Sequence, residues 1–389
     1  MAESPLLLAL HRIGPYHRAR FAALAVRCPL VVLETRPHTR EYPWESQSTR
    51  GYQLEQLQGQ PDPDRDPPSP RIDRQLDALI ARHTPRALIS VGWADRSYQR
   101  LLLAAHRHRL PLLLVSDSRQ QDGCRTPMGE LPKRLLLAGF SAALVAGRQS
   151  RAYLQRLGFP PEAIVQPWDV VDNQAWYQDD ATLPLEQRQP PHWLCVSRFV
   201  AKKNHRTLLE AFARYQRAGG RWGLHLIGEG PLETSIRDGI AALPEPAVVW
   251  ITPFQQFTSL RKHYHAARGL ILASRSDQWG LVVNEAMAAG LPVLVSQACG
   301  CAPDLIADGR TGFLLDPHDA GQIAAQLSRF ERLSPAQLGG LTAAAAAAIK
   351  TFEPETFAAA LERAVARACR RPRFSRRACL TAGILALRP

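Results

Sequence analysis

The chain has 389 residues and a formal net charge of +13, so it is long enough for two α/β domains that each bury a core. The excess of positive charge favours anionic partners such as a nucleoside diphosphate, an acidic membrane surface or nucleic acid. The first apolar run, 5–10, is too short for an export signal and lacks a basic leader, and no stretch approaches the length of a membrane span. We therefore expect a cytoplasmic protein, at most peripheral on the inner membrane face.

The first part of the chain alternates apolar runs with helical patterns, as parallel-sheet units do. Buried strands are predicted at 6–10, 30–33, 87–91, 112–115 and 142–145. Helices are predicted between them at 18–27, 72–83, 97–108 and 128–137.

The segment 59–70 is rich in Pro and Asp and predicts an exposed loop. Its Asp62, Asp64 and Asp66 superficially match an Asp-x-Asp metal signature, but prolines surround them where that signature needs the end of a strand. We interpret them as a solvated charge run and predict no catalytic metal.

A second set of units follows a polar segment rich in Gln, Asp and Pro at 174–191, which we interpret as an interdomain linker. Strands are predicted at 192–196, 223–227, 248–251, 269–273 and 292–296. Helices are predicted at 204–217, 231–241 and 257–266, and three more close the chain at 319–332, 335–350 and 354–369.

The seven cysteines are scattered, and their odd number argues against a complete disulfide framework. Reduced, mostly structural thiols are the expectation. Cys299 and Cys301 are too closely spaced for a zinc knuckle and predict a tight turn.

Two carboxylates, Asp277 and Glu285, lie eight positions apart across a predicted loop-to-helix junction. Gly280 between them lets backbone approach a ligand, and the start of the following helix exposes unpaired N–H groups that suit a phosphate. Such a pair fits a ligand with hydroxyls at both ends of a diphosphate. The alternative is a helix whose first turn is capped by Asp277 and whose Glu285 forms a surface ion pair.

This segment, 276–290, resembles the Glu-x7-Glu signature of the family 4 (group 1) glycosyltransferases, retaining enzymes of the GT-B fold, with Asp277 in place of the first Glu. Further family-like motifs occur in the same order at 196–204, 226–232 and 304–314. The resemblance is strong from 193 to 317 and weaker before that.

The resemblance implies an α/β GT-B fold, in which two Rossmann-like parallel-sheet domains face a cleft and a C-terminal helix crosses back to the first domain. The expected parts are an acceptor-side domain at 1–173, a linker at 174–191, a nucleotide-sugar-binding domain at 192–352, a crossover helix at 353–369 and a basic tail at 370–389.

By resemblance, Arg198 and Lys203 bind the donor diphosphate and take part in catalysis. Cations at a departing diphosphate stabilise the transition state more than the ground state. Arg can grip phosphate oxygens in a fork, whereas Lys supplies a movable point charge.

The resemblance also assigns the two carboxylates to opposite ends of the donor. Glu285 is expected to accept hydrogen bonds from the ribose, and Asp277, counted as catalytic, to bind hydroxyls of the transferred sugar. Backbone amides are expected to face phosphate at Gly280, Leu281 and Val282. Because Asp is one methylene shorter than Glu, the substitution at 277 leaves the donor sugar open.

The first domain is expected to hold the acceptor and the far side of the donor. Gly14 follows the first strand, where family members place a Gly-containing loop near the reacting sugar, although a plain turn fits equally well. His17, Trp93 and Asp117 are the acceptor-side candidates, and the aromatic ring of Trp93 suits a sugar or simple core packing.

The resemblance implies a glycosyltransferase that moves a sugar from a nucleoside diphosphate donor, UDP or GDP, to a glycan or lipid-linked acceptor, as in polysaccharide biosynthesis. Retention, no metal and no cofactor are expected. The alternatives are a nucleotide-sugar epimerase of similar fold, a degenerate sugar-nucleotide binder and a basic nucleic-acid-binding protein. No aromatic-basic module or zinc finger supports a nucleic-acid partner.

The C-terminal tail concentrates arginines before a short apolar run, 380–387. Basic residues attract anionic lipid at roughly 1 kcal/mol each, so reversible membrane attachment is one expectation and a solvated, disordered tail is the other. The arginines are Arg367, Arg370, Arg371, Arg373, Arg376 and Arg377.

Overall fold

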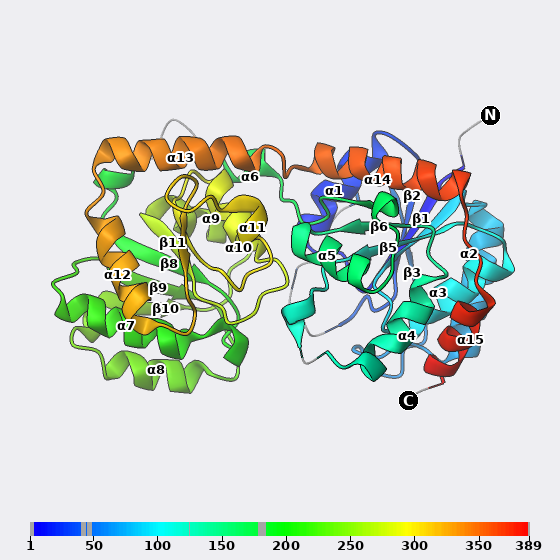
Figure 1. Cartoon of the computed structure of the whole chain (residues 1–389), viewed down its shortest axis with the longest axis horizontal. Coiled ribbons are helices and arrows are strands. Elements are labelled where there is room, and N and C mark those ends of the chain that lie inside the picture. The colour runs from blue at the N-terminus through cyan, green and yellow to red at the C-terminus, as the bar shows by residue number, and fades with distance from the viewer. Residues whose placement is uncertain (1–3, 40–43, 45–48, 124, 178–183, 388–389) are drawn as a thin grey trace. The chain divides into compact units, whose positions relative to one another are not determined.

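The computed structural model describes residues 4–39, 44, 49–123, 125–177 and 184–387. The chain divides into two compact units (Figure 1). Unit 1 comprises Met1–Val170 and Pro354–Pro389, and unit 2 comprises Val171–Glu353.

Unit 1 is built on a parallel sheet of 7 described strands in the order β3-β2-β1-β4-β5-β6-β7. Its central strands are mostly apolar and almost wholly buried, as expected of a sheet covered on both faces. The strands are β1 (Leu6–Leu10), β2 (Leu30–Glu34), β3 (Gln53–Gln56), β4 (Ala87–Val91), β5 (Leu112–Ser116), β6 (Ala142–Val145) and β7 (Ile164–Val165).

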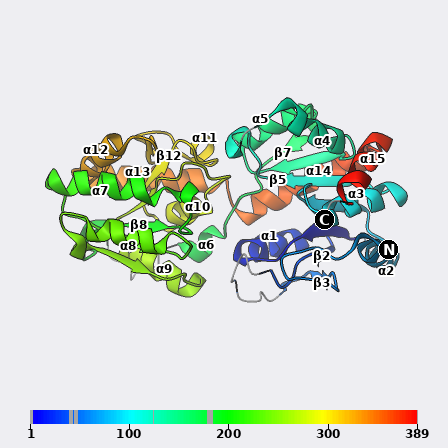
Figure 2. The same cartoon turned by 90° about the horizontal axis from the view of Figure 1, so that it is seen from below.

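Two sets of helices pack on this sheet: α14 contacts α1 and strands β4 to β7, while α3 contacts α2 and α15. Figure 2 shows α15 beside α3. The helices are α1 (Pro15–Ala25), α2 (Ser69–His83), α3 (Arg96–Arg107), α4 (Pro127–Leu137), α5 (Arg148–Arg156), α14 (Pro354–Arg370) and α15 (Arg376–Leu385). The return of α14 to unit 1 matches the expected crossover helix.

Unit 2 has a parallel sheet of 6 described strands in the order β10-β9-β8-β11-β12-β13. The strands are β8 (His192–Val196), β9 (Gly223–Ile227), β10 (Val249–Thr252), β11 (Gly269–Leu272), β12 (Val293–Ser296) and β13 (Phe313–Leu315).

In unit 2, α7 packs against α8 and α12, while α10 packs against α6 and α13. The helices are α6 (Asn173–Trp176), α7 (His205–Arg217), α8 (Glu233–Ala241), α9 (Phe257–Ala266), α10 (Leu281–Ala288), α11 (Ala302–Leu305), α12 (Ala320–Glu331) and α13 (Pro335–Ile349). None of the helices in the described part of the chain has both the length and the hydropathy needed to cross a bilayer.

Two segments differ from the sequence expectation. The expected linker, 174–191, falls in unit 2, because Trp176 of α6 is buried against Tyr264, with 5.1 Å between the centroids of their rings. The expected basic tail, 370–389, falls in unit 1, because Ala378 and Ala382 of α15 are buried in its core. Residues 178–183 of the linker and 388–389 of the tail lie outside the described residues.

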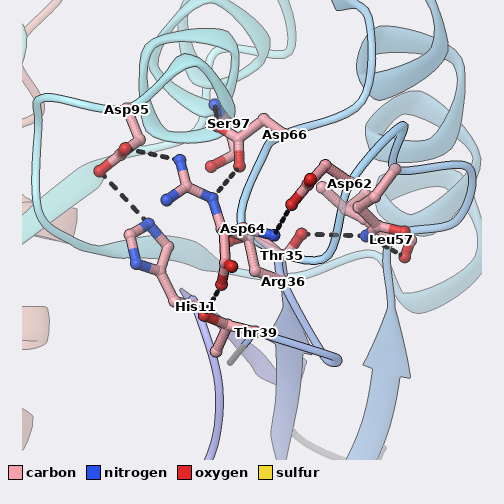
Figure 3. Close-up of polar contacts among 11 residues, drawn as sticks. His11, Thr35, Arg36, Thr39, Leu57, Asp62, Asp64, Asp66, Asp95 and Ser97 are labelled. Carbon is pink, nitrogen blue, oxygen red and sulfur yellow. Dashed lines mark hydrogen bonds and ion pairs between the residues drawn. The ribbon is translucent and has the colours of Figure 1, made fainter. Parts of the chain in front are cut away.

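The prediction of a solvated charge run at 59–70 is wrong for Asp66, which is buried. Its carboxylate accepts hydrogen bonds from the Arg36 guanidinium at 2.8 Å and from the backbone N–H of Ser97 at 2.7 Å (Figure 3). These contacts come from strand and helix ends outside the loop, so local composition could not indicate them.

Candidate functional site

Most of the predicted donor-site residues gather at one edge of the unit 2 sheet. The strand order reverses direction between β8 and β11, and ligands of open parallel sheets bind at the carboxyl ends of strands at such a point. Arg198 follows β8, and Asp277 follows β11. Lys203 lies just before α7, and Gly280 is the N-terminal cap of α10.

Lys203 and Asp277 form an ion pair between Nζ and Oδ2, across 74 residues of sequence. Both side chains are mostly shielded, with exposed fractions of 14% and 13%. Asn204 fixes the lysine loop, because its Nδ2 donates to the carbonyl oxygens of Ala273 and Pro317 at 3.0 and 2.7 Å. The cation expected at the diphosphate and the carboxylate expected at the sugar are therefore direct neighbours.

The glycine turn after β9 packs tightly on the loop that carries Arg198. Gly228 has φ +152°, and a Cβ placed there would lie 2.0 Å from the carbonyl oxygen of Ser197. The backbone N–H of Phe199 donates to the Glu229 carbonyl at 2.8 Å. Arg198 itself is exposed, and the turn holds the backbone on both sides of it.

The start of α10 has the geometry of an anion site. Gly280 is its N-terminal cap in the left-handed region, with φ +101°, which a residue with a side chain rarely adopts. The N–H groups of Leu281 and Val282 lie in the first turn and have no partner within the helix. Negative charge is stabilised at such a helix start.

The loop that carries Asp277 is braced by the two-cysteine turn. Gly300 donates its N–H to the Asp277 carbonyl at 2.9 Å, and Cys301 donates to the Trp279 carbonyl at 3.0 Å. Cys299 and Cys301 are buried thiols, and burial raises the pKa of Cys301 well above its usual range. The tight turn expected from the spacing thus supports the carboxylate loop.

Glu285 is fully buried on α10, at 0% exposure, and accepts a hydrogen bond from the hydroxyl of Tyr264 on α9. The interpretation of Glu285 as half of a surface ion pair is therefore wrong. Sequence analysis missed Tyr264, because nothing in the pattern of its own helix indicates which distant carboxylate it contacts.

In unit 1, Gly14 caps the start of α1, and a Cβ at this position would lie 2.4 Å from the Trp44 ring. Its N–H donates to Nδ1 of His17 at 3.0 Å. Burial, with a smaller contribution from the charge of Arg20, lowers the pKa of His17 to about 3. His17 is therefore a neutral hydrogen-bond acceptor at physiological pH.

The other two acceptor-side candidates follow neighbouring strands of the same sheet. Trp93 lies after β4 and Asp117 after β5, so both are at the carboxyl edge of the sheet. Trp93 is 9% exposed. Burial raises the pKa of Asp117. A search of the described residues for three or more His, Cys, Asp or Glu side chains able to hold a metal ion finds no such group.

Residues 184–338 match the model of the family described as "Glycosyl transferases group 1". That segment includes the ion pair of Lys203 with Asp277, the start of α10 and the contact of Glu285 with Tyr264.

Curated relatives include D-inositol 3-phosphate glycosyltransferases from two bacteria. The Streptomyces scabiei protein is 40% identical over 34% of this chain and 28% of its own length. The Mycobacterium bovis protein is 33% identical over 66% of this chain and 55% of its own length. The chain thus spans about half or less of the length of these relatives.

Among solved structures, that of HepE from Anabaena in complex with UDP resembles this chain with a TM-score of 0.71 at 15% identity. The match covers 94% of this chain and 100% of that one. Together with the two parallel sheets, this likeness assigns the chain the GT-B fold.

Proposed function

We propose that this chain, whose residues 184–338 belong to the group 1 glycosyltransferases, transfers a sugar from a nucleoside diphosphate sugar to a hydroxyl of a glycan or lipid-linked acceptor. The proposal includes membership of family 4, retention of anomeric configuration, and catalysis without metal or cofactor. The observation that carries it is the set of groups at the β8–β11 edge: the Lys203–Asp277 pair, the start of α10 and the buried Glu285.

The donor diphosphate is placed against the N–H groups of Leu281 and Val282, with Arg198 and Lys203 as its cations. When the bond from the anomeric carbon to the diphosphate oxygen breaks, its electron pair stays on the diphosphate. Fixed donors and cations already aimed there stabilise that charge without reorganising, which lowers the barrier.

Asp277 binds hydroxyls of the sugar in this proposal, while its partner Lys203 stays on the phosphate side. The ion pair orients the carboxylate before substrate arrives. Glu285 accepts hydrogen bonds from the ribose, and Tyr264 orients that carboxylate as a positioning residue.

Retention follows if the acceptor hydroxyl attacks from the face that the diphosphate leaves. The acceptor oxygen then bonds to the anomeric carbon, and its proton passes to the departing phosphate oxygen. No protein nucleophile takes part in this route.

UDP is the favoured donor nucleotide, because HepE from Anabaena has been solved in complex with UDP and with UDP-glucose. The likeness to HepE supports the fold and the choice of donor nucleotide, and nothing about the acceptor. GDP remains the second donor to test.

We also propose contact with an anionic membrane surface through α15. This helix buries Ala378 and Ala382 on one side and exposes Leu380 and Ile384, at 68% and 56%, on another. Arg376 and Arg377 at the start of this helix are exposed as well, and apolar side chains together with arginines suit a lipid surface with negative headgroups.

Liposome co-sedimentation tests the membrane contact. Replacing Leu380 and Ile384 with Ser should reduce sedimentation with anionic liposomes, whereas the exposed, distant Val26→Ser on unit 1 serves as the control. Equal sedimentation of wild type and the α15 variant would exclude the contact.

The transfer activity is tested by incubating the chain with UDP-, GDP-, TDP- and ADP-sugars, with and without glycan or polyprenyl-linked acceptors. Acceptor-dependent release of nucleoside diphosphate, unaffected by EDTA, is expected, and NMR of the product reports its anomeric configuration. An altered donor sugar formed without acceptor would indicate an epimerase. Binding of oligonucleotides at physiological salt, with no nucleotide release, would indicate a nucleic-acid-binding protein.

A further inference from the structure

His205 is a buried residue beside the donor-site cations that the proposed transfer mechanism does not use. It is the first residue of α7, two positions after Lys203, and its exposed fraction is 3%. A polar ring buried this deeply needs protein partners in place of water, so its contacts indicate what the residue does.

The His205 ring contacts the residues on either side of Arg198. Its Nε2 shares a hydrogen bond of 3.0 Å with the hydroxyl of Ser197. Its ring packs edge-on against Phe199, with 5.0 Å between the ring centroids, an arrangement that aromatic pairs favour. Phe199 is fully buried, at 0% exposure. Arg198 therefore lies between two residues that both rest on His205.

The backbone of the same two residues is fixed by β9 and the turn that follows it. The N–H of Ser197 donates to the Ile227 carbonyl at 3.0 Å, and the Phe199 carbonyl accepts from the N–H of Leu232 at 3.1 Å. These are backbone bonds, whereas His205 supplies side-chain contacts that join the loop to α7. The loop that carries the exposed Arg198 is thus held by two elements of unit 2.

The His205 ring acts as a neutral group. Burial, with a smaller contribution from the charge of Lys203, lowers the pKa of His205 to about 4. At physiological pH one ring nitrogen therefore carries a proton and the other is an acceptor. A neutral imidazole adds no third cation to Arg198 and Lys203, so its contribution to a diphosphate site is the contacts that it makes with the loop.

We propose that His205 is a positioning residue for Arg198, an inference that rests on the proposed transfer function. It fixes the loop 197–199 on α7, so that the Arg198 guanidinium meets the diphosphate oxygens as the bond to the sugar breaks. Stabilisation of that charge depends on cations already in place, and a misplacement of about 1 Å can lower a rate by about 10²-fold. Loss of the His205 contacts should therefore lower kcat, while donor affinity, which other groups share, changes less.

The test measures nucleotide release by the full chain, with the sugar donor and the acceptor on which the wild type is most active. His205→Phe keeps a ring against Phe199 but removes the hydrogen bond to Ser197. It should lower kcat by about tenfold or more and change the donor KM by less than about threefold. His205→Gln carries an amide that can bond to the Ser197 hydroxyl, so its kcat should return to within about threefold of wild type.

His192→Phe is the matched control. His192 is also buried, at 4% exposure, and its Nδ1 lies 2.7 Å from the Pro190 carbonyl oxygen, but it stands at the amino end of β8, away from Arg198. Its kcat should stay within about twofold of wild type. Urea unfolding compares the stability of the variants. If His205→Phe does not fold, Ser197→Ala removes the same hydrogen bond from a half-buried position and should also lower kcat.

The Arg198→Ala background distinguishes positioning from a general effect on stability. If His205 acts through Arg198, adding His205→Phe should change kcat by less than about twofold in that background. The same fall in kcat with and without Arg198, an unchanged kcat in both His205→Phe and Ser197→Ala, or no recovery in His205→Gln would overturn the assignment. Absence of nucleotide release by wild type with every donor would contradict the proposed function, and with it this inference. Transfer by wild type with an unaffected His205→Phe would contradict the inference alone.

Discussion

Replacement of Glu285 tests the donor site most directly, because two variants separate nucleotide binding from stability. Glu285→Ala removes a fully buried carboxylate and leaves the Tyr264 hydroxyl, also buried, without this acceptor. Loss of this hydrogen bond to a carboxylate costs about 1.5–3 kcal/mol, and loss of a buried methylene adds about 0.8 kcal/mol. We expect the free energy of unfolding to fall by about 2–4 kcal/mol. Glu285→Gln keeps an oxygen for Tyr264 and should cost less than about 1 kcal/mol.

Both variants should bind UDP more weakly than wild type. A hydrogen bond to a charged group contributes about 1.5–3 kcal/mol, so loss of the carboxylate charge should raise the Kd for UDP by about ten- to a hundredfold. Tyr215→Phe is the matched control, since it removes a hydroxyl-to-carboxylate contact with Glu331 elsewhere in unit 2 and lowers stability, and its Kd for UDP should change by less than about fivefold. Urea unfolding measures the free energy of unfolding, and calorimetric titration measures the Kd for UDP. Wild-type affinity in Glu285→Gln would refute the ribose assignment.

Arg198→Ala should lower the transfer rate on the order of 10²-fold and weaken donor affinity by a smaller factor, since its contact strengthens as the diphosphate departs. A fall in donor affinity by the same factor as the rate would contradict this. Lys203→Met should lower the free energy of unfolding by about 1–3 kcal/mol, because Asp277 loses its cation. The double variant with Asp277→Asn should recover part of that free energy in urea unfolding, and no recovery would show that the two residues are not coupled. Because the folded chain keeps His17 neutral down to about pH 3, the unfolded chain binds more protons between pH 6.5 and 3, and stability falls as pH drops through that window. His17→Gln, which retains an acceptor for the Gly14 N–H, should reduce that slope by at most about 1.4 kcal/mol per pH unit; an unchanged slope would contradict the burial of a neutral imidazole.

The effect expected of Glu285→Ala illustrates what the sequence left open. The motif alone gives Glu285 one expected role, as an acceptor of hydrogen bonds from the ribose. The structure adds a cost in stability, because the carboxylate is buried against Tyr264. Spacing along the chain indicates a shared helix but not which distant side chain completes the contact.

The missed strands have local causes. β3 (Gln53–Gln56) is a largely exposed edge strand with mostly polar residues, and β7 (Ile164–Val165) and β13 (Phe313–Leu315) are too short for a periodic signal. α15 was treated as part of a tail because its alanines, which pack in the unit 1 core, carry a weak apolar signal.

By itself, the sequence determined what depends on local pattern: the buried strands, the alternation with helices, the order of the motifs and the helix 354–369 that closes the fold. Apolar runs must be buried and their period follows backbone geometry, so these features are readable from neighbouring residues. Only the tertiary structure decided the pairing of Lys203 with Asp277 and the network that joins Arg36, Asp66 and Asp95. These partners lie 30 to 74 residues apart and meet because parallel strands bring their carboxyl ends to one edge, where strand order, rather than sequence distance, sets which side chains touch.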